Sequence, residues 1–179
     1  MDDRMEERMG IEENDHVRGN REAEVVLIEY ADFQCPYCAR AHKALTSLQQ
    51  QHGERVTLVY RHLPLTDLHP FAQPAAEAAE AAGAQGKFWE MHDALFENQG
   101  MLDEDALPAL AANLQLDAER FRSEFEGAEH RGRVEADLRQ AHALGAQGTP
   151  TFFINGERYQ GDSDHASLAG AIGKALGGA

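Results

Sequence analysis

The chain has 179 residues, of which 42% are hydrophobic, and this is enough for one domain with its own core and without a disulfide framework. Its formal net charge of -15 opposes phosphate backbones and anionic lipid, so we expect neither nucleic-acid nor membrane-surface binding. No apolar run approaches the length of a spanning helix and residues 1–14 lack a secretory signal, so we expect a cytoplasmic protein without membrane contact.

The first expected elements are an arm, a strand, a helix and a second strand. Residues 1–20 carry charges of both signs without apolar periodicity, which predicts a mobile arm ahead of a single domain over residues 21–179. Val25 to Tyr30 begins with four consecutive aliphatic residues, a pattern typical of a central strand covered on both faces. Ala39 to Gln51 has apolar residues at helical spacing, and Val56 to His62 alternates as a strand does.

The segment from residue 67 to residue 145 has an almost wholly helical character. We expect helices in it over Phe71–Ala84, Lys87–Asn98, Glu104–Leu114, Ala118–Glu126 and Arg131–Leu144. Asp103 and Asp117 directly precede predicted helices, so we expect them to be the N-cap residues. The sequence therefore predicts a helical insertion of about 80 residues.

Strand character returns after the helical segment. Thr151 to Ile154 and Glu157 to Gln160 flank Asn155-Gly156, which is a strong signal for a β-hairpin, and a last helix is predicted over Asp164 to Leu176. A right-handed crossover through the first helix would set the first two strands parallel. The expected architecture is an α/β fold with a mixed central sheet and helices on its faces. The insertion lies between the second and third core strands, and the core comes from residues 21–66 and 146–179.

The chain has two cysteines, Cys35 and Cys38, which stand three positions apart. Pro36 suits the first position of a helix, which places Cys35 at an exposed helix start and Cys38 on the buried stripe. Unpaired N–H groups and the positive dipole end at a helix start favour the thiolate, the reactive form of cysteine. We therefore expect a dithiol/disulfide switch in which Cys35 attacks and Cys38 resolves the mixed disulfide.

Other interpretations of the pair remain open at this point. A Cys-x-x-Cys motif can hold half of a zinc site, with His42 as a third ligand, although the chain has no second cysteine pair. A structural disulfide is also compatible, although closing so short a loop stabilises little. A c-type haem is not expected, because Ala39 stands where a histidine would be needed. We expect no metal and no cofactor, and we interpret His42, His62, His69 and His92 as helix-surface or capped polar residues.

Several motifs together resemble the DsbA-like branch of the thioredoxin superfamily. They are EYADFQCPYC at residues 29–38, RHLPL at 61–65, HP at 69–70, KFWEMH at 87–92 and GTPTFFING at 148–156. The middle three resemble stand-alone bacterial members of that branch, which are related to domains appended to some sodium/proton antiporters. The resemblance runs from about Asp15 to the C-terminus, and it implies a thioredoxin-like fold and thiol-disulfide oxidoreductase activity.

The resemblance also implies roles for residues outside the cysteine pair. Thr149-Pro150 matches a loop with a cis-proline, which faces the cysteines and offers backbone groups to an extended substrate. Glu29 matches a buried acid that exchanges a proton with Cys38. In several relatives a lysine on the second strand accompanies this acid, whereas the nearest cation here is Arg61.

Tyr37 and Pro36 lie between the cysteines, where the Tyr37 side chain is expected to be exposed and to shape substrate contact. Glutaredoxins carry the same Pro-Tyr pair, which makes glutathione a candidate redox partner. We expect disulfide exchange with protein or peptide thiols, together with a redox partner that the sequence does not identify. The alternatives are a glutathione-dependent transferase or isomerase on a related fold, and a non-enzymatic thiol redox sensor.

Overall fold

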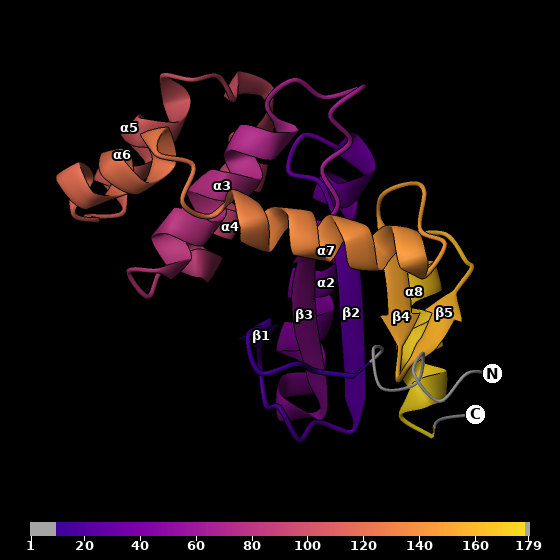
Figure 1. The fold of residues 1–179 in the computed structure, drawn as a ribbon. Helices are drawn as coiled ribbons and strands as arrows, with labels where there is room; N and C mark the ends of the chain where they lie inside the picture. The colour runs from indigo at the N-terminus through magenta and orange to yellow at the C-terminus, as the bar shows by residue number, and fades with distance from the viewer. Residues whose placement is uncertain (1–9, 178–179) are drawn as a thin grey trace.

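Five strands form one mixed sheet in the computed structural model of the chain, which describes residues 10–177 (Figure 1). The strands are β1 (His16–Arg18), β2 (Val25–Ala31), β3 (Val56–His62), β4 (Thr151–Ile154) and β5 (Glu157–Tyr159). They lie in the order β1-β3-β2-β4-β5, with β2 and β3 parallel and the other neighbours antiparallel. The mixed sheet with its parallel central pair is therefore confirmed.

Seven α-helices lie in the described part of the chain. They are α2 (Pro36–His52), α3 (Ala72–Gly83), α4 (Phe88–Glu97), α5 (Ala106–Asn113), α6 (Ala118–Glu126), α7 (Arg131–Ala143) and α8 (His165–Ala175). Two 3-10 helices, η1 (Gly53–Arg55) and η2 (Gln99–Met101), follow α2 and α4. The helices expected between residues 67 and 145 are confirmed, with ends that differ from the expected ones by at most two residues. Within residues 10–177, no helix has both the length and the apolar character needed to cross a membrane.

Helices cover both faces of the sheet. On one face α2 and α8 pack against Leu27 of β2 and Leu58 of β3. On the other face α7 crosses the strands, as Figure 1 shows, and its Ala141 packs with Ile28 and Val59. Strand β3 is buried at every residue and β2 at all but one, which explains the four consecutive aliphatic residues at the start of β2.

The helical insertion builds its own part of the core. In Figure 1 helices α3 to α6 lie beyond one end of the strands, and α3 packs against α4, α6 and α7. The buried face of α3 is almost entirely alanine, and these small side chains allow neighbouring helices to approach closely. The same cluster of buried side chains contains Cys35 and Cys38, so the insertion packs directly beside the cysteine pair.

The expectation of a mobile N-terminal arm is wrong for residues 10–20. Residues 1–9 lie outside the described part of the chain. Strand β1 pairs antiparallel with β3, which sets His16 opposite Tyr60. The carboxylate of Asp15 accepts hydrogen bonds of 2.9 and 2.7 Å from the guanidinium of Arg61, and both side chains are 1% exposed. The arm is therefore held by the pairing of β1 with β3 and by a buried ion pair. Neither interaction produces an apolar pattern in the sequence from which it could be predicted.

The predicted hairpin between β4 and β5 is confirmed. Asn155 and Gly156 take positive φ angles of 48° and 84°, which suit the tight turns that join antiparallel strands. The amide oxygen of Asn155 also accepts a hydrogen bond from the N–H of Val26 at 2.8 Å. The turn thereby holds β4 against β2, and the start of β4 is brought toward the cysteine pair.

Candidate active site

Cys35 and Cys38 lie where β2 ends and α2 begins. Cys35 is the N-cap residue with an extended backbone, and Pro36 takes the first helical position, as predicted. Both cysteines are free thiols, and their exposed fractions are 4% for Cys35 and 0% for Cys38. The expectation that Cys35 is exposed is therefore wrong, because the loop at Thr149 and the helical insertion cover this end of α2.

The loop between β2 and α2 is held by polar contacts on two sides. The buried carboxylate of Asp32 accepts hydrogen bonds from the N–H groups of Gln34 at 2.7 Å and Leu65 at 2.9 Å. The N–H of Cys35 donates to the carbonyl of Asp32 at 3.1 Å. The side-chain amide of Gln99, on η2, donates to the carbonyl of Cys35 at 2.9 Å. Sequence reasoning missed Asp32 and Gln99, although the position of Asp32 within the cysteine motif was a usable signal.

The two thiols have opposite pKa shifts. A hydrogen bond with the Cys38 thiol is the main cause that lowers the pKa of Cys35 from 9.0 to about 6, and Thr149 and backbone N–H groups of α2 add to it. Burial raises the pKa of Cys38 well above its ordinary value, and the neighbouring Cys35 and Glu29 act in the same direction. Near neutral pH the site therefore combines a thiolate at Cys35 with a protonated thiol at Cys38.

Glu29 lies on the face of β2 that α2 covers, two residues after Leu27 on the same face. Its side chain is buried, and its Oε1 atom has no hydrogen-bond partner among the described residues. Burial raises the pKa of Glu29 from 4.5 to about 8, and the nearby charge of Cys35 raises it further. Glu29 is thus an acid that can hold or release a proton near neutral pH.

Tyr60 stands opposite Glu29 on β3 and was missed by sequence reasoning. Its side chain is fully buried, and its hydroxyl has no partner within residues 10–177. Burial raises the pKa of Tyr60 well above its ordinary value, and the charges of Glu29 and Cys38 add to this effect. Arg61 does not accompany Glu29, because successive residues of a strand point to opposite faces, and its guanidinium bonds Asp15 on the other face.

The loop at Thr149 faces the cysteine pair. The peptide bond between Thr149 and Pro150 is cis, as the resemblance implies. The Sγ atom of Cys35 donates to the carbonyl of Thr149 at 3.6 Å, although the two residues are far apart in the sequence. Pro150 directly precedes β4, so this loop extends the backbone of β4 to a position beside Cys35.

Large hydrophobic side chains are exposed on segments that surround the cysteines. Tyr37, between the cysteines, is 57% exposed, and Leu68 and Met101 are 72% and 68% exposed. The guanidinium of Arg40 lies over the Tyr37 ring, with its central carbon 4.8 Å from the ring centre. The exposure of Tyr37 confirms the expectation for this residue, whereas Leu68 and Met101 were not foreseen.

Leu68 and Met101 belong to segments that are tied to the cysteine loop. The Nδ1 atom of His69, the residue after Leu68, lies 2.7 Å from the carboxylate of Asp32. Met101 ends η2, the same short helix from which Gln99 bonds the loop. The three exposed apolar residues therefore come from separate segments that converge on one site.

Two of the histidines expected at the surface are buried instead, because His62 lies inside β3 and His92 on the inner face of α4. His92 Nδ1 lies 2.8 Å from the carboxylate of Asp93, and His42 Nε2 lies 3.9 Å from the same oxygen. Among residues 10–177, neither cysteine belongs to a group of three side chains that could share a metal ion. The interpretation of the pair as a zinc site with His42 is therefore not supported.

A family model described as thioredoxin matches residues 12–174. Among curated relatives, the Na(+)/H(+) antiporters NhaA 1 of Salinispora arenicola and NhaA of Herminiimonas arsenicoxydans are 48% and 41% identical over 93% and 89% of this chain. The chain spans a quarter, 25%, of the length of both relatives. These relatives overturn the expectation of a cytoplasmic protein, because their matching segments are parts of proteins named as sodium/proton antiporters.

Solved structures match the chain over almost its full length. A thioredoxin-like oxidoreductase from Silicibacter pomeroyi DSS-3 is 32% identical, with a TM-score of 0.78 over 94% of this chain and 95% of that one. Alpha-DsbA1 of Wolbachia pipientis, 21% identical, shares the fold with a TM-score of 0.84 over 97% and 96% of the two chains. The expected thioredoxin-like fold with its helical insertion is confirmed, and it supports thiol-disulfide oxidoreductase activity. The chain belongs to the thioredoxin family.

Proposed function

We propose that this protein is a protein disulfide oxidoreductase, which exchanges disulfides with protein or peptide thiols through Cys35 and Cys38. The observation that carries the proposal is the opposite pKa shift of two contacting thiols, to about 6 for Cys35 and well above the ordinary value for Cys38. Attack by a thiolate followed by internal resolution requires this combination, because only the attacking sulfur needs to be ionised in the resting state.

In the reducing direction, the Cys35 thiolate attacks one sulfur of a substrate disulfide and forms a mixed disulfide, and the other substrate sulfur leaves as a thiolate. Cys38 then loses its proton and attacks Cys35, which releases the second substrate sulfur. The products are a substrate dithiol and a disulfide between Cys35 and Cys38. An external dithiol or glutathione then reduces this disulfide, and oxidation of a substrate follows the same steps in reverse.

We propose that Glu29 in its ionised form takes the proton from Cys38 in the resolving step, and that protonated Glu29 returns it in the reverse step. Its carboxyl is buried with an unpartnered oxygen, and its pKa of about 8 lets it change protonation near neutral pH. The charge of Glu29 contributes to the raised pKa of Cys38, which indicates that the two groups are close enough to influence one another.

The substrate that fits this site is an extended polypeptide segment with apolar side chains. The loop at Thr149 and Pro150 offers backbone groups beside Cys35, which suits a segment that pairs as an added strand. Tyr37, Leu68 and Met101 offer exposed apolar surface for its side chains. Pro36, also exposed, completes the surface around the attacking sulfur.

Single-cysteine variants test the proposal in two assays, insulin reduction and oxidation of reduced RNase. Cys35→Ser should abolish turnover, because no attacking thiolate remains. Cys38→Ser should also stop turnover, and it should accumulate mixed disulfides with the substrate that non-reducing electrophoresis and mass spectrometry detect. Lys43→Ala, on the exposed face of the same helix, is the matched control and should retain turnover.

Full turnover by Cys38→Ser would contradict the dithiol mechanism and favour a route through glutathione that needs one thiol. Absence of turnover in the wild-type protein, combined with redox-dependent partner binding, would identify a thiol sensor instead. The wild-type protein and Cys38→Ser give a different pair of results for each function. Testing both therefore distinguishes the dithiol mechanism, the glutathione route and the thiol sensor.

A further inference from the structure

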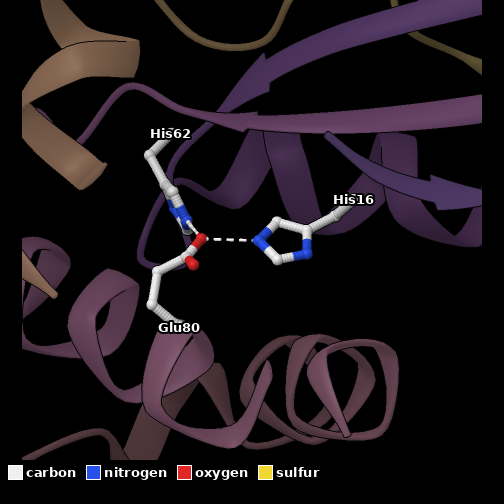
Figure 2. Close-up of side chains that lie close together, drawn as sticks. All are labelled: His16, His62 and Glu80. Carbon is white, nitrogen blue, oxygen red and sulfur yellow. Dashed lines mark hydrogen bonds and ion pairs between the residues drawn. The ribbon is translucent and has the colours of Figure 1, made fainter. Parts of the chain in front are cut away.

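A group of side chains with metal-binding chemistry lies away from the cysteine pair, between β1, β3 and α3. Figure 2 shows His16 of β1, His62 at the end of β3 and Glu80 of α3, with both rings turned toward the carboxylate. The Nε2 atoms of His16 and His62 both lie 2.7 Å from the same Oε1 atom of Glu80. All three atoms that could bind a metal lie within 4.8 Å of one another.

We propose that His16, His62 and Glu80 bind a zinc(II) ion, with water as the fourth ligand. Two imidazoles and one carboxylate form a donor set that zinc takes in sites with an open fourth position. Bonds of about 2.1 Å in tetrahedral geometry set neighbouring ligand atoms about 3.4 Å apart, so each nitrogen–oxygen separation must increase by about 0.7 Å, through movement of an imidazole or of the Glu80 carboxylate. A shift of this size is within the reach of His16, which lies on a short edge strand.

Packing already orients both imidazoles toward the carboxylate. The ring of His16 stacks on Phe88, with ring centres 3.5 Å and planes 1° apart. Gly83 leaves room for this stack, because a Cβ atom there would lie 3.3 Å from Phe88 and 3.4 Å from His16. The backbone N–H of His62 donates to the carboxylate of Asp137 at 2.9 Å, which fixes the end of β3. Ligands held in this way lose little further freedom when they bind an ion.

The balance of charge around the group favours a cation. The side chain of Glu80 is 8% exposed, and its ion-pair partners within residues 10–177 are the two histidines. A carboxylate buried to this extent is costly unless cationic or hydrogen-bonding groups surround it, and both imidazoles approach one of its oxygens. The nearby Asp137, by contrast, pairs with Arg133 at 3.1 Å. A divalent ion bound here would place a full positive charge against the Glu80 carboxylate.

An ion can reach the group from the side of β1. The His16 side chain is 18% exposed, whereas that of His62 is 1% exposed. The site therefore has one ligand at the surface and two in the interior, which leaves an open side for entry and for the water ligand.

A second group, made of His42, His92 and Asp93, is the weaker candidate and provides an internal control. The carboxylate of Asp93 already bonds the guanidinium of Arg18 at 2.8 Å, and His42 Nε2 lies 3.9 Å from it. A guanidinium on the carboxylate opposes the approach of a second cation. We therefore expect His42 to be dispensable for zinc binding.

The test is a titration with zinc(II) alone, in competition with a chromogenic chelator, after removal of bound metals from the protein. The protein is kept oxidised, so that Cys35 and Cys38 are joined and supply no thiolate ligand. We expect one ion per chain, and a loss of affinity of at least about tenfold in His16→Ala and Glu80→Gln. His42→Ala should bind as the wild type does. Cobalt(II) should give the visible absorption of a four-coordinate site in the wild type and not in His16→Ala.

Absence of stoichiometric zinc binding by the oxidised wild type would overturn the proposal, as would unchanged affinity in His16→Ala. If His42→Ala alone lost zinc binding, the ion would be assigned to the second group, and this result would also overturn the proposal. Glu80→Gln keeps the shape of the side chain, so it decides the question if circular dichroism shows that His16→Ala is misfolded. Because the thiols stay oxidised throughout, the result is independent of the proposed disulfide exchange.

Discussion

At Cys35, the pKa of about 6 results from the Cys38 thiol beside it and from its position at the start of α2. A thiolate reacts with alkylating agents and a thiol does not, so the alkylation rate follows the ionised fraction. We expect the rate in the reduced protein to rise with pH around a midpoint near pH 6 and to level off about one pH unit higher, measured with iodoacetamide and mass spectrometry. A midpoint near that of a free thiol would contradict the described electrostatics, and Cys38→Ala, which removes the hydrogen-bond donor, should move the midpoint upward.

Glu29 should make the stability of the protein depend on pH. Its pKa rises from 4.5 in its ordinary state to about 8 in the folded protein, so the unfolded chain ionises first as the pH increases. Folding stability is therefore lost as the pH rises from about 4.5 to 8, by up to roughly 3 kcal/mol at pH 7. Glu29→Gln removes this ionisation, and urea unfolding should show a stabilisation at pH 7 that is smaller at about pH 4. An equal effect at both pH values would argue against a buried, protonated Glu29.

Among the elements, β1 depends most clearly on one buried ion pair. Asp15 and Arg61 are both 1% exposed, and Asp15→Asn would leave the buried guanidinium without its main counter-charge. We expect a loss of about 3 kcal/mol in the free energy of unfolding, measured with urea. The matched control is the pair of Glu24 and Arg55, whose side chains are 50% and 56% exposed. Glu24→Gln should cost less than about 1 kcal/mol, and a similar loss in both variants would show that burial of the first pair has no special role.

The helical elements were predictable because each carries its own local pattern. α6 begins and ends at the predicted residues, and Asp117 caps it by accepting a hydrogen bond from the N–H of Arg120 at 3.0 Å. Asp103 accepts a bond of 2.8 Å from the N–H of Ala106, but α5 begins two residues later than expected and its N-cap residue is Asp105 instead. β1 has three residues and no apolar period, so its pairing with β3 was not visible in the sequence.

At the scale of the whole molecule, the site lies where the sheet, α2 and the helical insertion meet. Its exposed apolar residues belong to α2 and to the insertion. Leu68→Ser and Met101→Ser remove exposed apolar surface from two segments that bond the cysteine loop, and they leave both thiols in place. Each should raise the KM for an apolar peptide disulfide several-fold, while the reaction of Cys35 with glutathione disulfide stays unchanged. Ala109→Ser, at an exposed position of α5, offers a comparison variant on the insertion. Unchanged KM values in both variants would indicate that the substrate approaches from another side.

The sequence by itself determined the type and order of the main elements and the presence of a reactive cysteine pair. These properties depend on residues within one or two helical turns, such as Cys35, Pro36 and Cys38, whose spacing alone sets their geometry on α2. Only the tertiary structure decided that Cys35 is buried and that Tyr60 stands opposite Glu29. Strand register and loop packing join residues distant in the chain, and no local pattern encodes which partners meet.

The same reason separates the histidines from the cysteines. The sequence indicated that the histidines are polar positions on separate segments, and nothing in their spacing brings His16 to Glu80, which lies 64 positions later. Their meeting depends on the antiparallel pairing of β1 with β3 and on the packing of α3 beside them. The cysteine chemistry was readable along the chain, whereas the proposed zinc site exists only in the folded molecule.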